Sequence, residues 1–188
     1  MDFAKDFSSD NSSFNTACAN GDIETIRAML DQGHSPNDKG LYWIPELEDD
    51  LAIKILEIFY EKGAKPDDSI IQAPACNGDL KTVKYLVERF GINPSYDEDA
   101  PVIAAASMGH MDMVKYLVGL GANPLNPEYE EGAETAMSGA ICKGHLEMVK
   151  YLIDSGATIP PNDDYFVKLA EERGHQSVVD HIRKINST

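Results

Sequence analysis

One segment of the chain recurs at a nearly fixed interval. It reads GHLEMVKYLIDSG at residues 144–156, and related segments occupy residues 109–121, 78–91 and 21–33. With a weaker copy that ends at Gly63, the glycines that close the copies lie 28 to 35 residues apart. Self-similarity at such a period indicates stacked repeats. We therefore expect the function on the surface that the repeats share.

Each copy has the spacing of a helix that follows a shorter helix. In the first copy the apolar residues fall on one helical face, and Gly33 lies where a left-handed residue ends a helix. The turn between the two helices is Asn20-Gly21. The apolar positions are Ile23, Ile26, Met29 and Leu30 in the first copy, and Ile53, Leu56, Phe59 and Tyr60 in the second.

Two copies depart from this pattern. Pro45 in the second copy and Pro74 in the third lie inside the shorter first helix. Because proline beyond the first turn breaks a helix, we expect the first helix of the second copy to be short or distorted. The second helix of the third copy is one residue longer than its counterparts, and the extra residue near Phe90 predicts a distortion at its end.

The most regular copies carry short motifs. The fourth copy has Ala100-Pro101-Val102, then Gly109-His110 at the turn, and Gly121-Ala122-Asn123-Pro124 at its end. The fifth copy has Gly144-His145 and Gly156-Ala157 in the same places. In these residues the chain resembles the ankyrin repeat family. The resemblance covers residues 12 to 185 in about six repeats, of which the second is degenerate.

The resemblance implies an all-α, ankyrin-like solenoid of stacked helix-turn-helix repeats with short hairpin fingers. The first helices would line the concave face and the second helices the convex face. We expect a tail or capping segment over residues 1–11 and one repeat domain over residues 12–188. A C-terminal capping repeat is expected from about residue 162, since His181, Arg183 and Lys184 give the end of the chain a charged face.

The chain is strongly acidic, with 16 Lys and Arg against 32 Asp and Glu and a formal net charge of −16. This charge disfavours nucleic acids and anionic membranes as partners. It suits a basic protein partner, or it serves solubility. No secretory signal and no run of about 20 apolar residues occurs. With three cysteines in no pairing pattern, we expect a cytoplasmic protein that is a monomer by itself.

Most of the acidic residues lie between a closing glycine and the next first helix. Acids at a helix start can cap free N–H groups, and Asp67-Asp68-Ser69 and Asn162-Asp163-Asp164 fit that role. Capping needs one or two acids per helix, which leaves the larger cluster at residues 128–134 for a partner. Tyrosine and tryptophan, which dominate interface hot spots, interleave with these acids. The candidate protein-binding residues are Tyr42, Trp43, Tyr96, Asp97, Glu98, Asp99, Glu128, Tyr129, Glu130, Glu131, Asp163, Asp164 and Tyr165.

Catalytic, cofactor-binding and metal-binding motifs are not found in the sequence. His110, His145 and His175 share one position in successive repeats, but repeats stack about 10 Å apart, too far for a shared ion. We expect these histidines to form hydrogen bonds across the turns between repeats. Cys76 and Cys142 lie two repeats apart, beyond the reach of a disulfide.

The sequence therefore predicts a non-catalytic module that needs no cofactor. Ankyrin-like stacks usually bind other proteins, so the resemblance implies a protein partner held by acidic, tyrosine-bearing fingers and the concave face. Two alternatives remain open from the sequence. One is an inhibitor or immunity protein that blocks the active site of an enzyme, and the other is a secreted effector that acts on a host protein.

Overall fold

The computed structural model describes residues 10–34, 49–63, 66–125, 135–159 and 164–186. These residues form helices and turns and contain no β-strand, which confirms the all-α prediction. The chain divides into two compact units. The first comprises Met1–Pro74 and Lys81–Ile92, and the second comprises Ala75–Leu80 and Asn93–Thr188.

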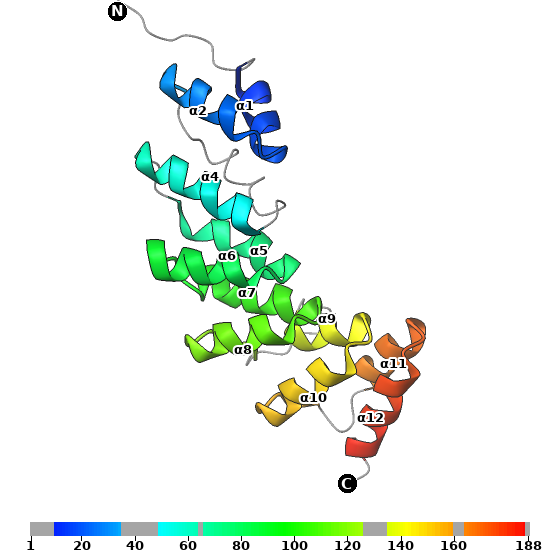
Figure 1. The fold of residues 1–188 in the computed structure, drawn as a ribbon. Helices are drawn as coiled ribbons and strands as arrows, with labels where there is room; N and C mark the ends of the chain where they lie inside the picture. The colour runs from blue at the N-terminus through cyan, green and yellow to red at the C-terminus, as the bar shows by residue number, and fades with distance from the viewer. Residues whose placement is uncertain (1–9, 35–48, 64–65, 126–134, 160–163, 187–188) are drawn as a thin grey trace, which may run out of the picture. The chain divides into compact units, whose positions relative to one another are not determined.

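The first unit begins with a helix pair and continues with a longer helix. Helix α1 packs against α2, and the side chain of Asp22 caps α2 by accepting a hydrogen bond from the Thr25 N–H at 3.1 Å. Gly33 follows α2 with a φ of 94°, as the glycine signal predicts. The bounds are Asp10–Ala19 for α1, Ile23–Asp31 for α2 and Asp49–Glu61 for α4 (Figure 1). The predicted first helix of the second repeat, with Pro45, lies outside the described residues.

The buried face of α4 differs from the prediction. It consists of Ala52, Ile55, Leu56, Ile58 and Phe59, whereas the side chain of Tyr60 is 41% exposed. The prediction is therefore confirmed for Leu56 and Phe59. It is wrong for Ile53, which is half-buried, and for Tyr60, which is exposed. Positions 52, 55, 56 and 59 follow the spacing of one helical face, and this face packs against the core.

The third repeat is irregular, as Pro74 and the extra residue near Phe90 predict. A 3₁₀ turn, η2 (Asp68–Ile71), precedes the short helix α5 (Gln72–Asn77), in which Pro74 lies. The following helix α6 (Leu80–Tyr85) continues as a π-helix, η3 (Leu86–Phe90), before Gly91 at φ 69°. A π-helix accommodates one extra residue, which accounts for the insertion near Phe90.

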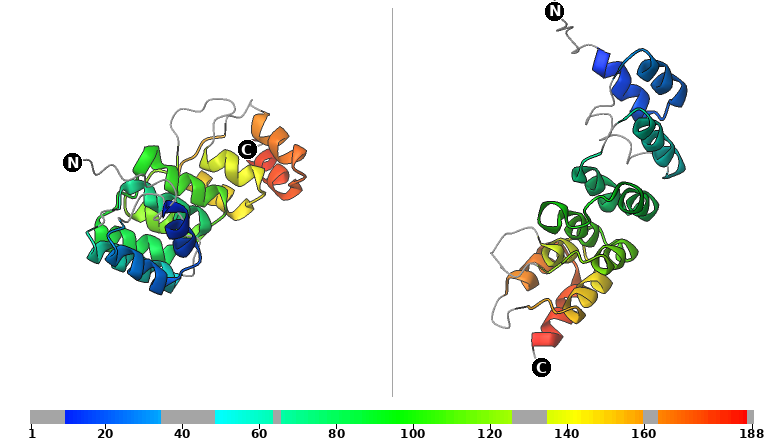
Figure 2. Two further views of the ribbon diagram at one scale, coloured as in Figure 1. Left: turned by 90° about the horizontal axis from the view of Figure 1, so that it is seen from above. Right: turned by 90° about the vertical axis from the view of Figure 1, so that its left-hand side faces the viewer.

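The second unit is more regular. Helix α9 lies between α7 and α11, while α8, α10 and α12 each follow one of these first helices (Figure 1 and Figure 2). We call α7, α9 and α11 the first helices, and α2, α4, α6, α8, α10 and α12 the second helices. The bounds are Tyr96–Ser107 for α7, Met111–Gly119 for α8, Ala136–Cys142 for α9, Leu146–Asp154 for α10, Tyr165–Glu172 for α11 and Gln176–Asn186 for α12.

From the third repeat to the last, the same three positions of the second helices are buried. They are the fourth, fifth and eighth residues after the turn glycine, and they face the core because they lie on one side of a helix. In the third repeat the π-helix begins at the last of these positions, Leu86, so the insertion leaves the buried set unchanged. The buried residues are Thr82, Val83 and Leu86, then Met113, Val114 and Leu117, then Met148, Val149 and Leu152, and finally Val178, Val179 and Ile182.

Histidine rings join the turns of successive repeats in the second unit. The Nε2–H of His110 donates to the Cys76 carbonyl at 2.9 Å, and that of His175 to the Cys142 carbonyl at 3.0 Å. These bonds confirm the role predicted for the two histidines. The three cysteines are free thiols; Cys18 is buried, and burial raises its pKa to about 12.

Candidate functional site

The first helices of the second unit start side by side. Their C-terminal turns are neighbours, because a Cβ on Gly109 would meet the His145 ring and one on Gly144 would meet the His175 ring. Since α9 also packs against both α7 and α11, the three helices run in the same direction. Their N-terminal ends therefore form one edge, with neighbouring helices about 8–10 Å apart. The described candidate residues of this unit lie along that edge.

The start of α7 is an acidic turn with an unusual backbone. Asp97, Glu98 and Asp99 have φ values of 50°, 53° and 68°, in the left-handed region that residues with a side chain rarely adopt. The side chains of Asp97 and Glu98 are exposed, while Tyr96 and Asp99 are half-buried. The Oδ1 atom of Asp99 is buried and has no hydrogen-bond partner among the described residues. Asp97 and Glu98 are thus accessible to solvent, and Tyr96 is accessible only in part.

The equivalent position in the next repeat shows why this start is irregular. Thr135 caps α9 by accepting a hydrogen bond from the Ser138 N–H at 3.0 Å, and the Ser138 hydroxyl accepts one from the Thr135 N–H at 2.9 Å. Ala100 occupies the Thr135 position in α7 and offers no hydroxyl. Without that cap, the chain enters the regular part of α7 through the left-handed turn, with Pro101 in the first regular turn, where proline is tolerated.

The start of α11 carries the other described candidates. Asp164 is exposed at the N-cap position, but its side chain makes no capping hydrogen bond. The Tyr165 ring is half-buried and lies 5.3 Å from the Phe166 ring. In the first unit, by contrast, Asp67 does cap a helix, because its carboxylate accepts from the Ser69 N–H at 2.8 Å.

The remaining candidates lie outside the described residues and stay predictions. Among the described ones, the structure brings two groups to the common edge, Tyr96–Asp99 at α7 and Asp164 with Tyr165 at α11. These groups belong to different repeats, with α9 between them. The candidates outside the described residues are Tyr42, Trp43, Glu128, Tyr129, Glu130, Glu131 and Asp163.

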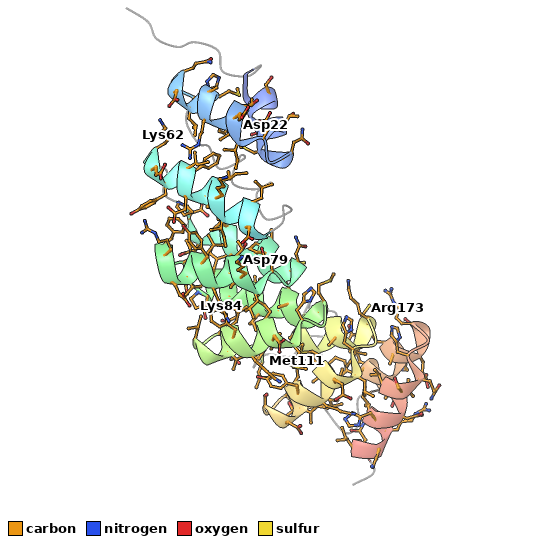
Figure 3. The ribbon with its side chains drawn as sticks, viewed as in Figure 1. Asp22, Lys62, Asp79, Lys84, Met111 and Arg173 are labelled. Atoms are coloured by element: carbon orange, nitrogen blue, oxygen red, sulfur yellow. The ribbon has the colours of Figure 1, made fainter. Side chains whose placement is uncertain are left out.

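The second helices carry charges of both signs, and several of these charges are paired. Lys84, Lys115 and Lys150 occupy equivalent positions on α6, α8 and α10 (Figure 3 labels Lys84). In the first unit, ion pairs join successive second helices, with Lys62 Nζ 2.6 Å from Asp31 Oδ1 and Lys81 bound to Asp50. No ion pair joins Asp97, Glu98 or Asp164 to any residue within the described ranges. Their charges are therefore available to a partner.

A cavity of about 360 Å³ lies beside the starts of α9 and α11. The sequence reasoning did not identify it. One feature of the sequence could have indicated the cavity, namely the long interval of 35 residues between Gly121 and Gly156. The residues that follow each of these two glycines form two walls of the cavity. The lining residues are Asn123, Pro124, Leu125, Thr135, Met137, Leu152, Gly156, Ala157, Thr158 and Phe166.

Among the described residues, no three His, Cys, Asp or Glu side chains are placed to hold a metal ion. None of the described helices has the length and apolar character to cross a membrane.

Comparison with known proteins gives a family and a fold. A family model described as ankyrin repeats (3 copies) matches residues 47–128 and 70–163. The crystal structure of the human ASB11 ankyrin repeat domain is similar, with a TM-score of 0.64 and 18% sequence identity, over 93% of this chain and 83% of that one. At this identity the likeness concerns the fold alone. No curated protein matches the chain.

Proposed function

Because the chain belongs to the ankyrin repeat family, whose members generally serve as protein-protein interaction modules, we propose that it is a non-catalytic module that binds a basic protein. The binding surface is the edge formed by the starts of the first helices and the acidic segments that precede them. Its described residues are Tyr96–Asp99, Asp164 and Tyr165, all of which belong to the second unit.

The observation that carries this proposal is the unpaired state of the acids at the edge. Asp97, Glu98 and Asp164 form no ion pair with a described residue, whereas several acids of the second helices do. The acids are also poorly explained as helix caps, since Asp164 makes no capping bond and Asp97–Asp99 adopt a left-handed turn. Unpaired like charges on one edge repel each other, and a basic partner relieves that repulsion.

The fingers supply the rest of the proposed surface. The segment from residue 126 to residue 134 contains Glu128, Glu130, Glu131 and Glu134 together with Tyr129, and no basic residue. Acids steer a basic partner towards the surface, and tyrosine contributes apolar contact area to the bound state. The proposal is therefore a partner with a basic surface that also offers apolar side chains.

Affinity capture from the source cell lysate at low and at high salt tests this proposal. The bait is the full chain, compared with the variant Glu128→Lys, Glu130→Lys, Glu131→Lys. We expect the wild-type bait to retain a basic protein at low salt and to lose most of it at high salt, because salt screens surface charges. The triple variant should retain much less of that protein at low salt.

A matched control separates the site from the net charge. The variant Glu61→Lys, Glu88→Lys, Asp154→Lys makes the same charge change at exposed positions near the ends of second helices. Cations are favourable near helix C-termini, so this control should fold. Capture equal in all three baits, or equal loss in both variants, would refute binding through the acidic edge.

A further inference from the structure

A methionine and a lysine meet on the surface of the second unit, where α7 and α9 end. Met108 is the C-cap of α7, Lys143 is the C-cap of α9, and the Lys143 Nζ donates a hydrogen bond to the Met108 Sδ at 3.0 Å. No ion pair joins Lys143 to an acid within the described ranges. Because a thioether sulfur is a weak acceptor, the ammonium lies beside a poor partner.

Met108 is also the most exposed methionine of the described residues, at 38% of its surface. A peroxide must reach the sulfur to oxidise it, so an exposed methionine reacts before a buried one. Met108 is therefore the first methionine that an oxidant in solution meets. The half-buried methionines are Met29 and Met111, and the buried ones are Met113, Met137 and Met148.

Oxidation converts this sulfur into a strong acceptor. A lone pair of the thioether sulfur attacks the terminal oxygen of a hydroperoxide, the O–O bond breaks, and hydrogen peroxide leaves as water. The sulfur loses two electrons, and the peroxide gains them. The new sulfoxide oxygen is polar and lies within reach of Lys143, so a charge-assisted hydrogen bond replaces the weak contact. In a buried core the same oxygen disrupts packing, whereas the exposed Met108 side chain leaves it accessible to water and to Lys143.

The backbones of α7 and α9 hold the two side chains in position. The helices pack against each other, and they touch one turn before Lys143, where a Cβ on Gly139 would be 2.5 Å from the Ser107 Cβ. Ser107 directly precedes Met108. The contact between Met108 and Lys143 is thus set by two packed helices, and a stronger bond there ties these helices together.

We propose that Met108 is a reversible oxidation site for hydroperoxides, and that Lys143 binds its sulfoxide and thereby ties α7 more firmly to α9. A methionine sulfoxide reductase reverses the step, since its two thiols supply the electrons and protons that release the oxygen as water while they form a disulfide. The site is independent of the proposed function, because both residues lie at the C-terminal ends of the first helices and the acidic edge lies at their N-terminal ends.

Peptide mapping after peroxide treatment tests the site. The full chain is treated with hydrogen peroxide at about pH 6.5, where ordinary thiols are almost wholly protonated and react slowly. Mass spectrometry then follows the oxidation of each methionine with time. We expect Met108 to be oxidised several-fold faster than Met29 or Met111. If Met108 reacts no faster than these two, the proposed site is wrong.

Thermal unfolding tests the role of Lys143. Oxidation of Met108 should raise the Tm by about 2–4 °C, the shift that one added hydrogen bond gives in a chain of this size, and reductase treatment should reverse the rise. Lys143→Leu should abolish the rise, whereas Lys143→Arg, which keeps a cationic donor, should preserve it. Arg173→Leu is the matched control and should keep the rise, because it removes the same charge at the equivalent C-cap of α11 (Figure 3 labels Arg173).

The results that would overturn the proposal are distinct. A wild-type Tm that stays constant or falls when Met108 is oxidised, or a rise that survives Lys143→Leu, would refute the bond to Lys143. Loss of the rise in Arg173→Leu would show that net charge, and not the contact, controls the Tm. Met108→Leu should show no change in Tm after the same treatment, and a rise there would place the effect at another residue.

Discussion

Glycine and histidine meet at each turn between repeats of the second unit. Gly109 has a φ of 80°, and a Cβ there would lie 2.8 Å from the Nδ1 atom of His145. Gly174, in the last repeat, has a similar φ of 75°, but a Cβ there would have no atom within 4 Å. The two glycines thus differ in the histidine contact and not in the backbone.

We expect Gly109→Ala to lower the free energy of unfolding by about 2–4 kcal/mol, since it adds a steric clash to the cost of a left-handed alanine. Gly174→Ala should cost about 1–2 kcal/mol, because it carries the backbone cost alone. Urea unfolding of both variants measures the difference. Equal losses would show that the histidine ring moves aside and that the contact does not stabilise the stack.

The same turns should make the stability depend on pH. Burial, assisted by the nearby Lys143, His110 and His175, lowers the pKa of His145 below its ordinary value of 6.5. The unfolded chain then binds a proton at a higher pH than the folded chain, so stability is lost as pH falls through about 6.5. We expect His145→Gln to lose less stability than the wild type between about pH 7.5 and pH 5. Identical pH profiles would contradict this role for His145.

At the scale of the helices, α7 and α9 pack unusually closely. Gly139 lies in α9, and a Cβ there would be 1.9 Å from the Ser107 Oγ and 2.5 Å from the Ser107 Cβ. In a free helix, alanine is favoured over glycine by about 1 kcal/mol. Here the clash between helices outweighs that gain.

Gly139→Ala should therefore reduce the free energy of unfolding by about 1–3 kcal/mol, the usual cost of overpacking. Adding Ser107→Gly removes the two atoms in closest contact, so the double variant should recover most of the loss. A double-mutant cycle from thermal or urea unfolding gives the coupling between the two sites. Additive effects would mean that α7 and α9 separate to admit the methyl group.

The helices also show what the sequence could and could not predict. The apolar period and the glycines predicted the second helices and their left-handed ends, and the extra residue predicted the distortion that the π-helix at Leu86–Phe90 contains. The exposure of Tyr60 was missed because a count of apolar residues treats its ring as core. In the structure that ring lies 5.2 Å from the Phe90 ring and 4.5 Å from the Arg89 guanidinium, on the surface of the first unit.

At the scale of the whole chain, the repeat determined the fold but did not determine the site. The acids could be predicted as a group because they fall between helices in every regular repeat. The cavity could not be predicted, because Leu125, Met137 and Phe166 belong to three separate elements and read as ordinary core residues. The left-handed turn at Asp97–Asp99 was also beyond prediction, since residues with a side chain rarely adopt a positive φ.

The central claim is that an acidic edge steers a basic partner onto the repeat stack. The most direct measurement is the association rate of the captured partner as a function of salt, for the wild type, the Glu128→Lys, Glu130→Lys, Glu131→Lys variant and the matched control. We predict that the association rates of the wild type and the control fall steeply as salt is added. The triple variant at residues 128, 130 and 131, the finger variant, should associate more slowly and at a rate that hardly depends on salt. A finger variant with the wild-type rate and salt dependence would contradict the claim.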